Sequence, residues 1–326
     1  HTMSDRDWSS DVCSSDLMMT MGIVAGAWAG AFTLDDNGAT VTVKDGEKPV
    51  LVYHYTMVDP PQGVAAKFHR SCYVHPLYGL DGEVMTEDFP KDHYHHRGVF
   101  WAWPMSTYGD RKMDVWTLDD ARQVFGKWIA KEAGPDKAVL EMEHHWVFDD
   151  APDKPIIRET VRMEILPVTG KARPIDISLR LENVSDKVFT MKGSDVSNKG
   201  YGGMCIRPDS TRKPLYFTAA DGTIEKDVLE LATPWADVSY ATKPGGDALS
   251  GVALFEHPSN PGYPHPGWIL RKYGFLGQSW PHTATHEMKP GDTVGLRYRM
   301  LVHRGDAKAA KVAEAFKAFA KGAAGR

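Results

Sequence analysis

The chain has 326 residues, of which 42% are hydrophobic and 25% charged, and its formal net charge is -5. These values are typical of an ordinary globular protein that buries a large core. The absence of a basic block argues against a nucleic acid partner. The 10 Trp, 12 Tyr and 21 Pro indicate a β-rich protein with aromatic-lined surfaces.

Two unusual segments open the chain. Residues 1–17 form an adaptor-like artefact, because residues 7–17 resemble the translation of a short sequencing adaptor, and we exclude them from the fold. Residues 18–31 are apolar and end in Ala-Gly-Ala, which predicts a truncated signal peptide and a periplasmic or secreted protein. A disordered Met-rich tail is the alternative. No later segment has the roughly 20 consecutive apolar residues of a spanning helix, so we expect no integral membrane association.

From residue 32 to residue 326 we predict a single domain built from antiparallel strands. Alternation of apolar and polar side chains marks half-buried strands, and Asn-Gly, Asp-Gly and Pro-Gly turns separate the segments that show it. Many strands without intervening helices indicate an all-β protein with a large antiparallel β-sandwich. In chain order the strand segments are residues 39–43, 50–55, 139–148, 157–166, 175–182, 251–255 and 294–303.

One helix follows these strands. Asp306 can cap a helix over residues 307–321. In it Ala309, Val312 and Phe316 belong to an apolar stripe that Phe319 continues. We expect this C-terminal helix to lie against one sheet.

The segment from residue 73 to residue 103 is the densest in chemically active side chains. It holds four of the 14 histidines, together with an arginine and several carboxylates and aromatic residues, of which we single out two carboxylates and three aromatic residues. Imidazoles act as acid, base or metal ligand near neutral pH, and indole faces suit sugar rings. A core needs few polar groups in so short a span, so we interpret this segment as the site. The residues are His75, His93, His95, His96, Arg97, Asp88, Asp92, Phe100, Trp101 and Trp103.

His96 is the predicted acid or base of this segment. Arg97 presents a rigid fork suited to substrate oxygens, with a structural pair to Asp92 as the alternative. If the segment enters a strand, His93 and His95 share one face. With His75 as a third ligand, they form an open site for one divalent metal ion. Histidines bonded to the backbone of a long loop are the third interpretation.

Two later segments add polar groups. Glu256 and His257 lie where a strand ends, and they are predicted to take the opposite proton role, with Asn260 as a further ligand contact; a structural turn with His257 on Trp268 is the alternative. Tyr201 and Arg207 lie among glycines and suit a sugar, although this segment is equally a hairpin with a bulge. The expected stacking residues are Trp101, Trp103 and Trp280. Whether Cys72 and Cys205 pair is left open.

Motifs distributed over the whole chain resemble one family of secreted bacterial proteins, labelled methane oxygenase PmoA or PmoA family. That resemblance implies a role in polysaccharide or glycoside utilisation. A methane oxygenase membrane subunit needs several spanning helices, and this sequence has none after its leader. At fold level the chain also resembles the galactose-mutarotase-like superfamily, in which imidazoles and a carboxylate on a concave sheet act on a sugar. The motifs are Tyr-Val-His-Pro-Leu-Tyr-Gly (73–79), Asp-Phe-Pro (88–90), His-Tyr-His-His-Arg-Gly (93–98), Tyr-Gly-Gly-Met-Cys-Ile-Arg (201–207), Phe-Glu-His-Pro-Ser-Asn-Pro (255–261), Trp-Ile-Leu-Arg-Lys-Tyr-Gly-Phe-Leu-Gly (268–277) and Leu-Arg-Tyr-Arg-Met-Leu-Val-His-Arg-Gly (296–305).

The leading hypothesis is therefore a secreted or periplasmic carbohydrate-active enzyme. It would act on a sugar or glycoside through histidine and carboxylate acid–base chemistry, as a hydrolase, lyase or epimerase. A metal-dependent enzyme using copper, iron or zinc is the second hypothesis. A non-catalytic sugar-binding module is the third, and it predicts binding without turnover.

Overall fold

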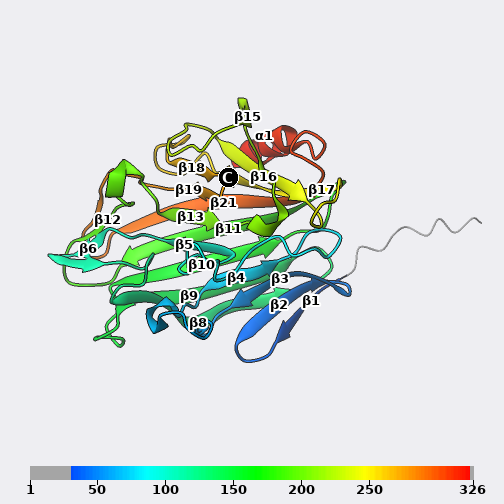
Figure 1. The fold of residues 1–326 in the computed structure, drawn as a ribbon. Coiled ribbons are helices and arrows are strands. Elements are labelled where there is room, and N and C mark those ends of the chain that lie inside the picture. Colours follow the sequence, from blue (N-terminus) through cyan, green and yellow to red (C-terminus); the bar gives the residue numbers. More distant parts are fainter. Residues whose placement is uncertain (1–30, 324–326) are drawn as a thin grey trace, which may run out of the picture.

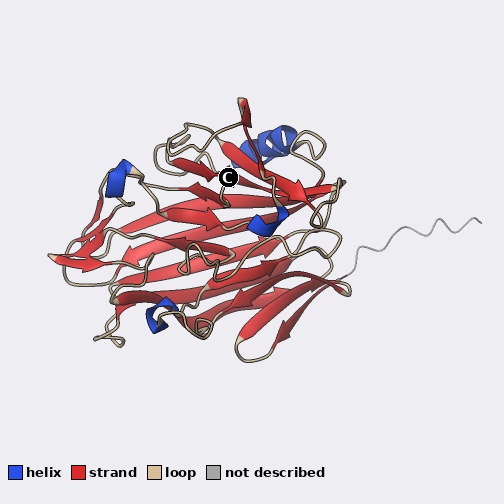
Figure 2. Ribbon diagram, viewed as in Figure 1, coloured by secondary structure: helices blue, strands red, loops and turns tan. Residues whose placement is uncertain are grey.

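Antiparallel β-sheet dominates the computed structural model, which describes residues 31–323 (Figures 1 and 2). The predicted artefact and signal peptide lie outside the described residues, except for Ala31. Strands of two large sheets stack face to face, and a small third sheet lies at one end of the sandwich. Within residues 31–323 no helix is both long enough and apolar enough to cross a membrane.

The first large sheet has eight strands and carries the segment predicted as the site. β4 and β5 lie at its centre, and β13, from a distant part of the chain, pairs with β5. In spatial order the strands are β1 (Phe32–Asp36), β2 (Thr40–Asp45), β3 (Lys48–His54), β4 (Tyr73–Leu77), β5 (Val99–Ala102), β13 (Gly203–Ile206), β19 (Phe275–Gln278) and β18 (Trp268–Arg271).

The second large sheet has nine strands, and its long central strands confirm the predicted alternation. Ile157, Val161 and Ile165 are buried on one face, while Arg158 and Arg162 lie on the other. In spatial order the strands are β15 (Gly222–Ile224), β14 (Tyr216–Ala219), β16 (Trp235–Ala241), β17 (Leu249–Glu256), β21 (Thr293–Arg304), β11 (Ala172–Asn183), β10 (Ile157–Ile165), β9 (Ala138–Phe148) and β8 (Ala121–Ala133).

The small sheet and three short 3₁₀ helices complete the strand framework. The small sheet contains β20 (His286–Met288), β12 (Phe189–Met191), β6 (Ser106–Tyr108) and β7 (Arg111–Met113). The 3₁₀ helices are Ala66–Phe68, Val196–Asn198 and Ser210–Arg212.

The core lies between the two large sheets. Trp103, directly after β5, packs against Trp146 of β9 with ring centroids 5.4 Å apart. Trp101 stacks on His144 of β9 at 6.3 Å. Because side chains alternate along a strand, Phe100 points to the outer face of the eight-stranded sheet. This alternation divides the site segment between core and surface.

The helix α1 (Val312–Ala323) packs on the outer face of the nine-stranded sheet, where Phe316 meets Phe255 of β17 at 5.5 Å. Asp306 accepts a hydrogen bond from the Ala309 N–H at 2.7 Å, but this turn does not continue into the helix. Lys311 has a φ of 56°, which interrupts helical geometry. The predicted helix therefore exists but begins five residues later than expected. The prediction of an all-β sandwich with one C-terminal helix is confirmed for the described residues.

Candidate functional site

The three histidines His93, His95 and His96 form one contact cluster, which we call the histidine cluster. Residues 92–98 make turns instead of a strand, since His93 N–H donates to the Pro90 carbonyl and His96 N–H to the His93 carbonyl, both at 2.9 Å. The turn stacks His96 on His93, with ring centroids 4.7 Å apart. His95 lies edge-on to His96 at 4.5 Å. The prediction that His93 and His95 share one face of a strand is therefore wrong, because no strand forms here.

Aromatic side chains on the outer face of the eight-stranded sheet pack against the histidine cluster. His96 contacts Phe100 of β5 at 5.7 Å and Phe275 of β19 at 5.4 Å. Trp116, from the loop after β7, lies 5.5 Å from His96 and 6.1 Å from Tyr201. The predicted ligand residue Tyr201 thus lies beside the cluster, although it comes from a distant segment.

Tyr273 closes another side of this site. Its ring stacks on His93 at 4.9 Å. The guanidinium groups of Arg207 and Arg271 lie 5.2 and 5.3 Å from its centroid. Arg271 also donates a hydrogen bond to the Tyr201 hydroxyl at 2.5 Å. The ring of Tyr273 therefore covers His93, and two guanidinium groups lie near that ring.

A chain of charged groups runs from the sheet to the surface through Arg207, Asp92 and His93. Arg207 is only 1% exposed and directly follows β13; its Nη2 donates to Asp92 Oδ1 at 2.8 Å. The other oxygen of Asp92 lies 3.1 Å from His93 Nδ1, a close contact that is not well aligned as a hydrogen bond. Arg207 Nε also lies 3.4 Å from Glu87 Oε2. A carboxylate beside Nδ1 favours the proton there and leaves the Nε2 lone pair of His93 available.

The ionisation states follow from burial and neighbouring charge. Burial, followed by the charges of His93 and Arg70, lowers the pKa of His95 to about 3. Burial and then His95 hold the pKa of His96 well below its usual value. Both rings are therefore neutral at pH 7. Burial raises the pKa of Asp92, but Arg207 and His93 outweigh it and lower the pKa, so this carboxyl is ionised.

Arg97 lies beneath the site and donates hydrogen bonds to backbone carbonyl oxygens. Its Nη1 donates to the carbonyl oxygens of Tyr94 at 2.6 Å and His96 at 3.0 Å, and its Nη2 donates to the Phe68 carbonyl. Its Nε lies 3.3 Å from Asp88. The side chain is fully buried, so Arg97 shapes the turn that carries the histidine cluster. Its carboxylate partner is Asp88 and not the predicted Asp92.

His75 lies on β4, away from the histidine cluster's mutual contacts. Its Nδ1 is 3.0 Å from Thr86 Oγ1. Within residues 31–323 no three His, Cys, Asp or Glu side chains are arranged to hold a metal ion. The predicted ligand set of His75, His93 and His95 is therefore not assembled, because the turn at residues 92–98 replaces the strand that it required.

The three predicted stacking tryptophans belong to the core. Trp101 and Trp103 are fully buried between the sheets, and Trp280 is 5% exposed. Trp103 Nε1 donates to the Trp280 carbonyl at 2.6 Å. None of these rings offers a face to a ligand. Phe100 and Trp116 contact the histidines instead, because alternation turns Trp101 and Trp103 inward.

The segment after β17 does not join the site. Glu256 lies in the core between the sheets, where His265 N–H donates to its Oε2 at 3.0 Å. Its burial raises the pKa to about 8. His257 points to the opposite face of the nine-stranded sheet and contacts Phe319 of α1 at 5.3 Å. The Asn260 side chain makes two hydrogen bonds with the backbone of Arg297. It donates to the carbonyl oxygen at 2.9 Å and accepts from the N–H at 2.7 Å. The structure therefore contradicts the prediction that Glu256 or His257 acts opposite His96 in proton transfer.

Comparison with known protein families identifies this chain's relatives. Residues 40–317 match the model described as "Family of unknown function (DUF6807)". The chain belongs to this family. The description says nothing of methane oxygenation, so the PmoA label receives no support from it. No curated protein matches the chain.

Solved structures share its general architecture at low identity. A heparan sulfate lyase from Pedobacter heparinus has 11% identity and a TM-score of 0.39, over 86% of this chain and 36% of the lyase. An alpha-galactosidase from Lactobacillus brevis has 9% identity and a TM-score of 0.41, over 85% of this chain and 39% of that one. A galactose mutarotase-like protein from Lactobacillus casei has 9% identity and a TM-score of 0.37, over 83% of this chain and 100% of that one. The chain spans less than two fifths of the length of the first structures that it matches. These likenesses are too loose to transfer a residue or an activity.

Proposed function

We propose that this protein is a carbohydrate-active enzyme that binds a sugar or glycoside over the histidine cluster and transfers a proton through His93. The chain Arg207–Asp92–His93 is the observation that carries this proposal. It gives an imidazole that is oriented by a carboxylate and still reachable, since the His93 side chain is 35% exposed.

The neighbouring groups suit a polyhydroxylated ring. Tyr273 is planar, partly apolar and half-buried, which favours contact with a sugar face. His96 Nδ1 and Arg207 Nη1 are buried nitrogens without a hydrogen-bond partner among residues 31–323. Such groups are costly unless a ligand or water satisfies them. Sugar hydroxyls both donate and accept, so they match this set.

The reaction class follows from what His93 can do. With the Asp92 carboxylate beside Nδ1, the free Nε2 of His93 accepts a proton from a hydroxyl, a carbon-bound hydrogen or a water. Tyr201, fixed by Arg271, offers a hydroxyl for the opposite proton role. Hydrolysis, elimination and epimerisation each need one base and one acid in this way. The leader pattern in residues 18–31 supports a periplasmic or secreted setting for this chemistry.

The test compares two carboxylate-paired histidines of similar exposure. His93→Gln should lower turnover on a responsive substrate from a panel of aryl glycosides and oligosaccharides by about 10²- to 10⁴-fold, the usual contribution of a general base. His145→Gln is the control, because His145 is 31% exposed and its Nε2 lies 2.9 Å from Glu143 Oε1 on the other sheet. Equal rates for the His93→Gln variant and the unmodified protein would rule out the mechanism. Saturable sugar binding without turnover would instead establish a binding module.

A further inference from the structure

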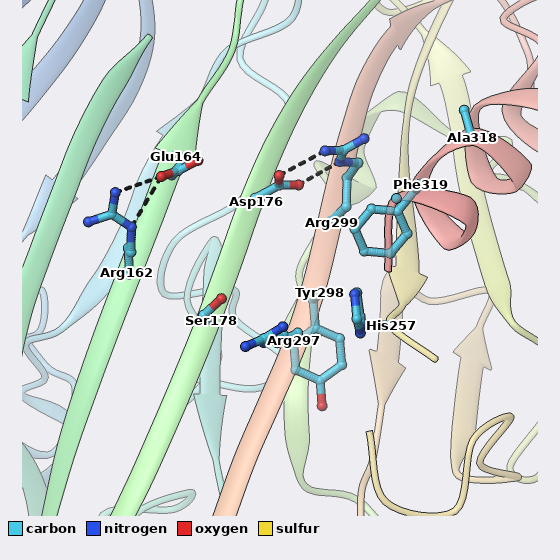
Figure 3. Close-up of a pocket in the computed structure, with 11 residues that line it drawn as sticks. Arg162, Glu164, Asp176, Ser178, His257, Arg297, Tyr298, Arg299, Ala318 and Phe319 are labelled. Carbon is cyan, nitrogen blue, oxygen red and sulfur yellow. Dashed lines mark hydrogen bonds and ion pairs between the residues drawn. The ribbon is translucent and has the colours of Figure 1, made fainter. Parts of the chain in front are cut away.

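A hollow of about 470 Å³ lies between α1 and the outer face of β10, β11 and β21 (Figure 3). This is the other side of the nine-stranded sheet from the core, and none of the histidine cluster lines it. Its volume falls within the range of small-molecule sites. Six residues set its chemistry: Asp176, Ser178, His257, Arg297, Arg299 and Phe319.

His257 supplies a hydrogen-bond donor to this hollow. Ser259 N–H donates to His257 Nδ1 at 3.1 Å, so Nδ1 is an acceptor and the ring proton of the neutral form is on Nε2. Burial and then Arg297 lower the pKa of His257, which keeps the ring neutral at pH 7. No hydrogen bond from Nε2 is formed within the described residues. The Nε2–H group is therefore free to donate to a ligand.

Arg297 supplies the second donor. It lies opposite Ser178 in the register of β21 and β11, so both side chains project from the same face. Its backbone is fixed by Asn260 at 2.7 and 2.9 Å, but its exposed guanidinium pairs with no carboxylate of residues 31–323. The backbone of Arg297 is thus fixed, while its guanidinium group has no ion-pair partner among the described residues.

The two carboxylates of the hollow are already paired. Arg299 donates to both oxygens of Asp176 at 2.5 and 2.8 Å. Arg162 donates to Glu164 at 2.6 Å. Among the lining residues the three guanidinium groups outnumber the two carboxylates by one positive charge, that of Arg297, and the C-terminal turn of α1 offsets about half of it. Local charge is therefore positive in a chain whose net charge is -5.

We propose that this hollow binds a small organic anion, whose carboxylate or phosphate group is held by Arg297 and His257. Arginine forks and N–H donors match the planar or tetrahedral oxygens of these groups. The volume exceeds that of a bare ion, so the anionic group belongs to a molecule of about the size of a sugar acid or sugar phosphate. This site is separate from the proposed active site and does not depend on it.

Calorimetric titration of the full chain tests the proposal with D-glucuronate, D-glucose 6-phosphate and neutral D-glucose. We expect one or both anions to bind through Arg297, and we expect Arg297→Gln to leave any binding of glucose at the proposed active site unchanged. Binding of only one anion identifies the carboxylate or the phosphate as the recognised group. Arg297→Gln should weaken binding at least about tenfold, since a charge-assisted hydrogen bond is lost. His257→Phe should weaken it as well, while keeping a ring against Phe319.

The control is Arg180→Gln, which removes an exposed arginine of β11 that pairs with Glu182 outside the hollow. It should leave the affinity within about twofold. His93→Gln should also leave it unchanged, which separates this site from the proposed active site. Glucose binding that Arg297→Gln weakens equally, absence of anion binding at millimolar concentrations, or an unchanged anion affinity in Arg297→Gln would each overturn the proposal.

Discussion

Glu256 offers a direct measurement of the energetic cost of a buried carboxyl. Its side chain is fully buried between the sheets, and its near contacts are Gln278 Nε2 at 3.4 Å and the His265 N–H at 3.0 Å. No cation pairs with it among the described residues. Burial therefore raises its pKa from 4.5 to about 8.

The sign of the pH effect follows from proton binding. Between pH 4.5 and 8 the folded state holds the Glu256 proton more often than the unfolded chain does, so stability falls as pH rises through this window. A rise of the pKa from 4.5 to about 8 corresponds to roughly 5 kcal/mol at most. Most of this penalty develops between pH 5 and pH 9, where we expect up to roughly 4 kcal/mol.

Glu256→Gln removes the titrating group and keeps its shape. We expect the variant to gain stability relative to the unmodified protein as pH rises, with the difference growing by roughly 2–4 kcal/mol from pH 5 to pH 9. Urea unfolding followed by tryptophan fluorescence at pH 5, 7 and 9 measures this difference. Glu287→Gln, at an exposed position on β20, is the control. Parallel stability curves for Glu256→Gln and the unmodified protein would refute the reasoning.

Three other changes test the site and the fold. Asp92→Asn should lower turnover at least about tenfold, because an amide facing His93 no longer selects the same tautomer; unchanged steady-state rates would contradict this. Gly98→Ala should destabilise the fold by about 1–3 kcal/mol in thermal unfolding, since its Cβ would lie 2.3 Å from the Val74 carbonyl oxygen, whereas Gly134→Ala, with open space around it, should cost far less. Cys72 and Cys205 are free and buried, so both should react with a thiol reagent only after denaturation, and protection that survives denaturation without reductant would indicate a disulfide instead.

The long strands of the nine-stranded sheet could be predicted because one of their faces is buried and the other is half-buried and polar. β10 and β11 show this contrast at almost every residue. The segment Val-Phe-Trp-Ala-Trp at residues 99–103 gives no such signal, since every side chain is apolar. Sequence alone therefore does not tell which aromatic rings face the core. This is why the sequence predicts Trp101 and Trp103 as stacking residues and gives Phe100, which contacts His96, no such role.

The contents of the site depend on contacts between distant segments. Three histidines of the dense segment contact one another, but their partners Arg207 and Tyr273 come from more than 100 residues away. β5 and β13 pair directly, and this pairing places Arg207 beside Gly98 and Asp92. No local pattern encodes it. The adjacency of Asp92 and His93 is a local signal of their contact, although the sequence offers Asp92 as a partner of Arg97.

At this site the buried residues position the loop, and the more exposed residue is the one proposed to transfer a proton. Arg97 and Arg207 are almost fully buried, and each uses its fork to fix the loop: Arg97 through three carbonyl oxygens and Arg207 through Asp92. A lysine cannot make these multiple directed bonds, so the loop geometry depends on arginine at both positions. His93 is the exposed end of this framework: its ring stacks on both His96 and Tyr273, while 35% of its side chain remains exposed. Removal of the His93 side chain is therefore expected to lower activity at a smaller cost in stability than removal of either buried arginine, which should lose both together.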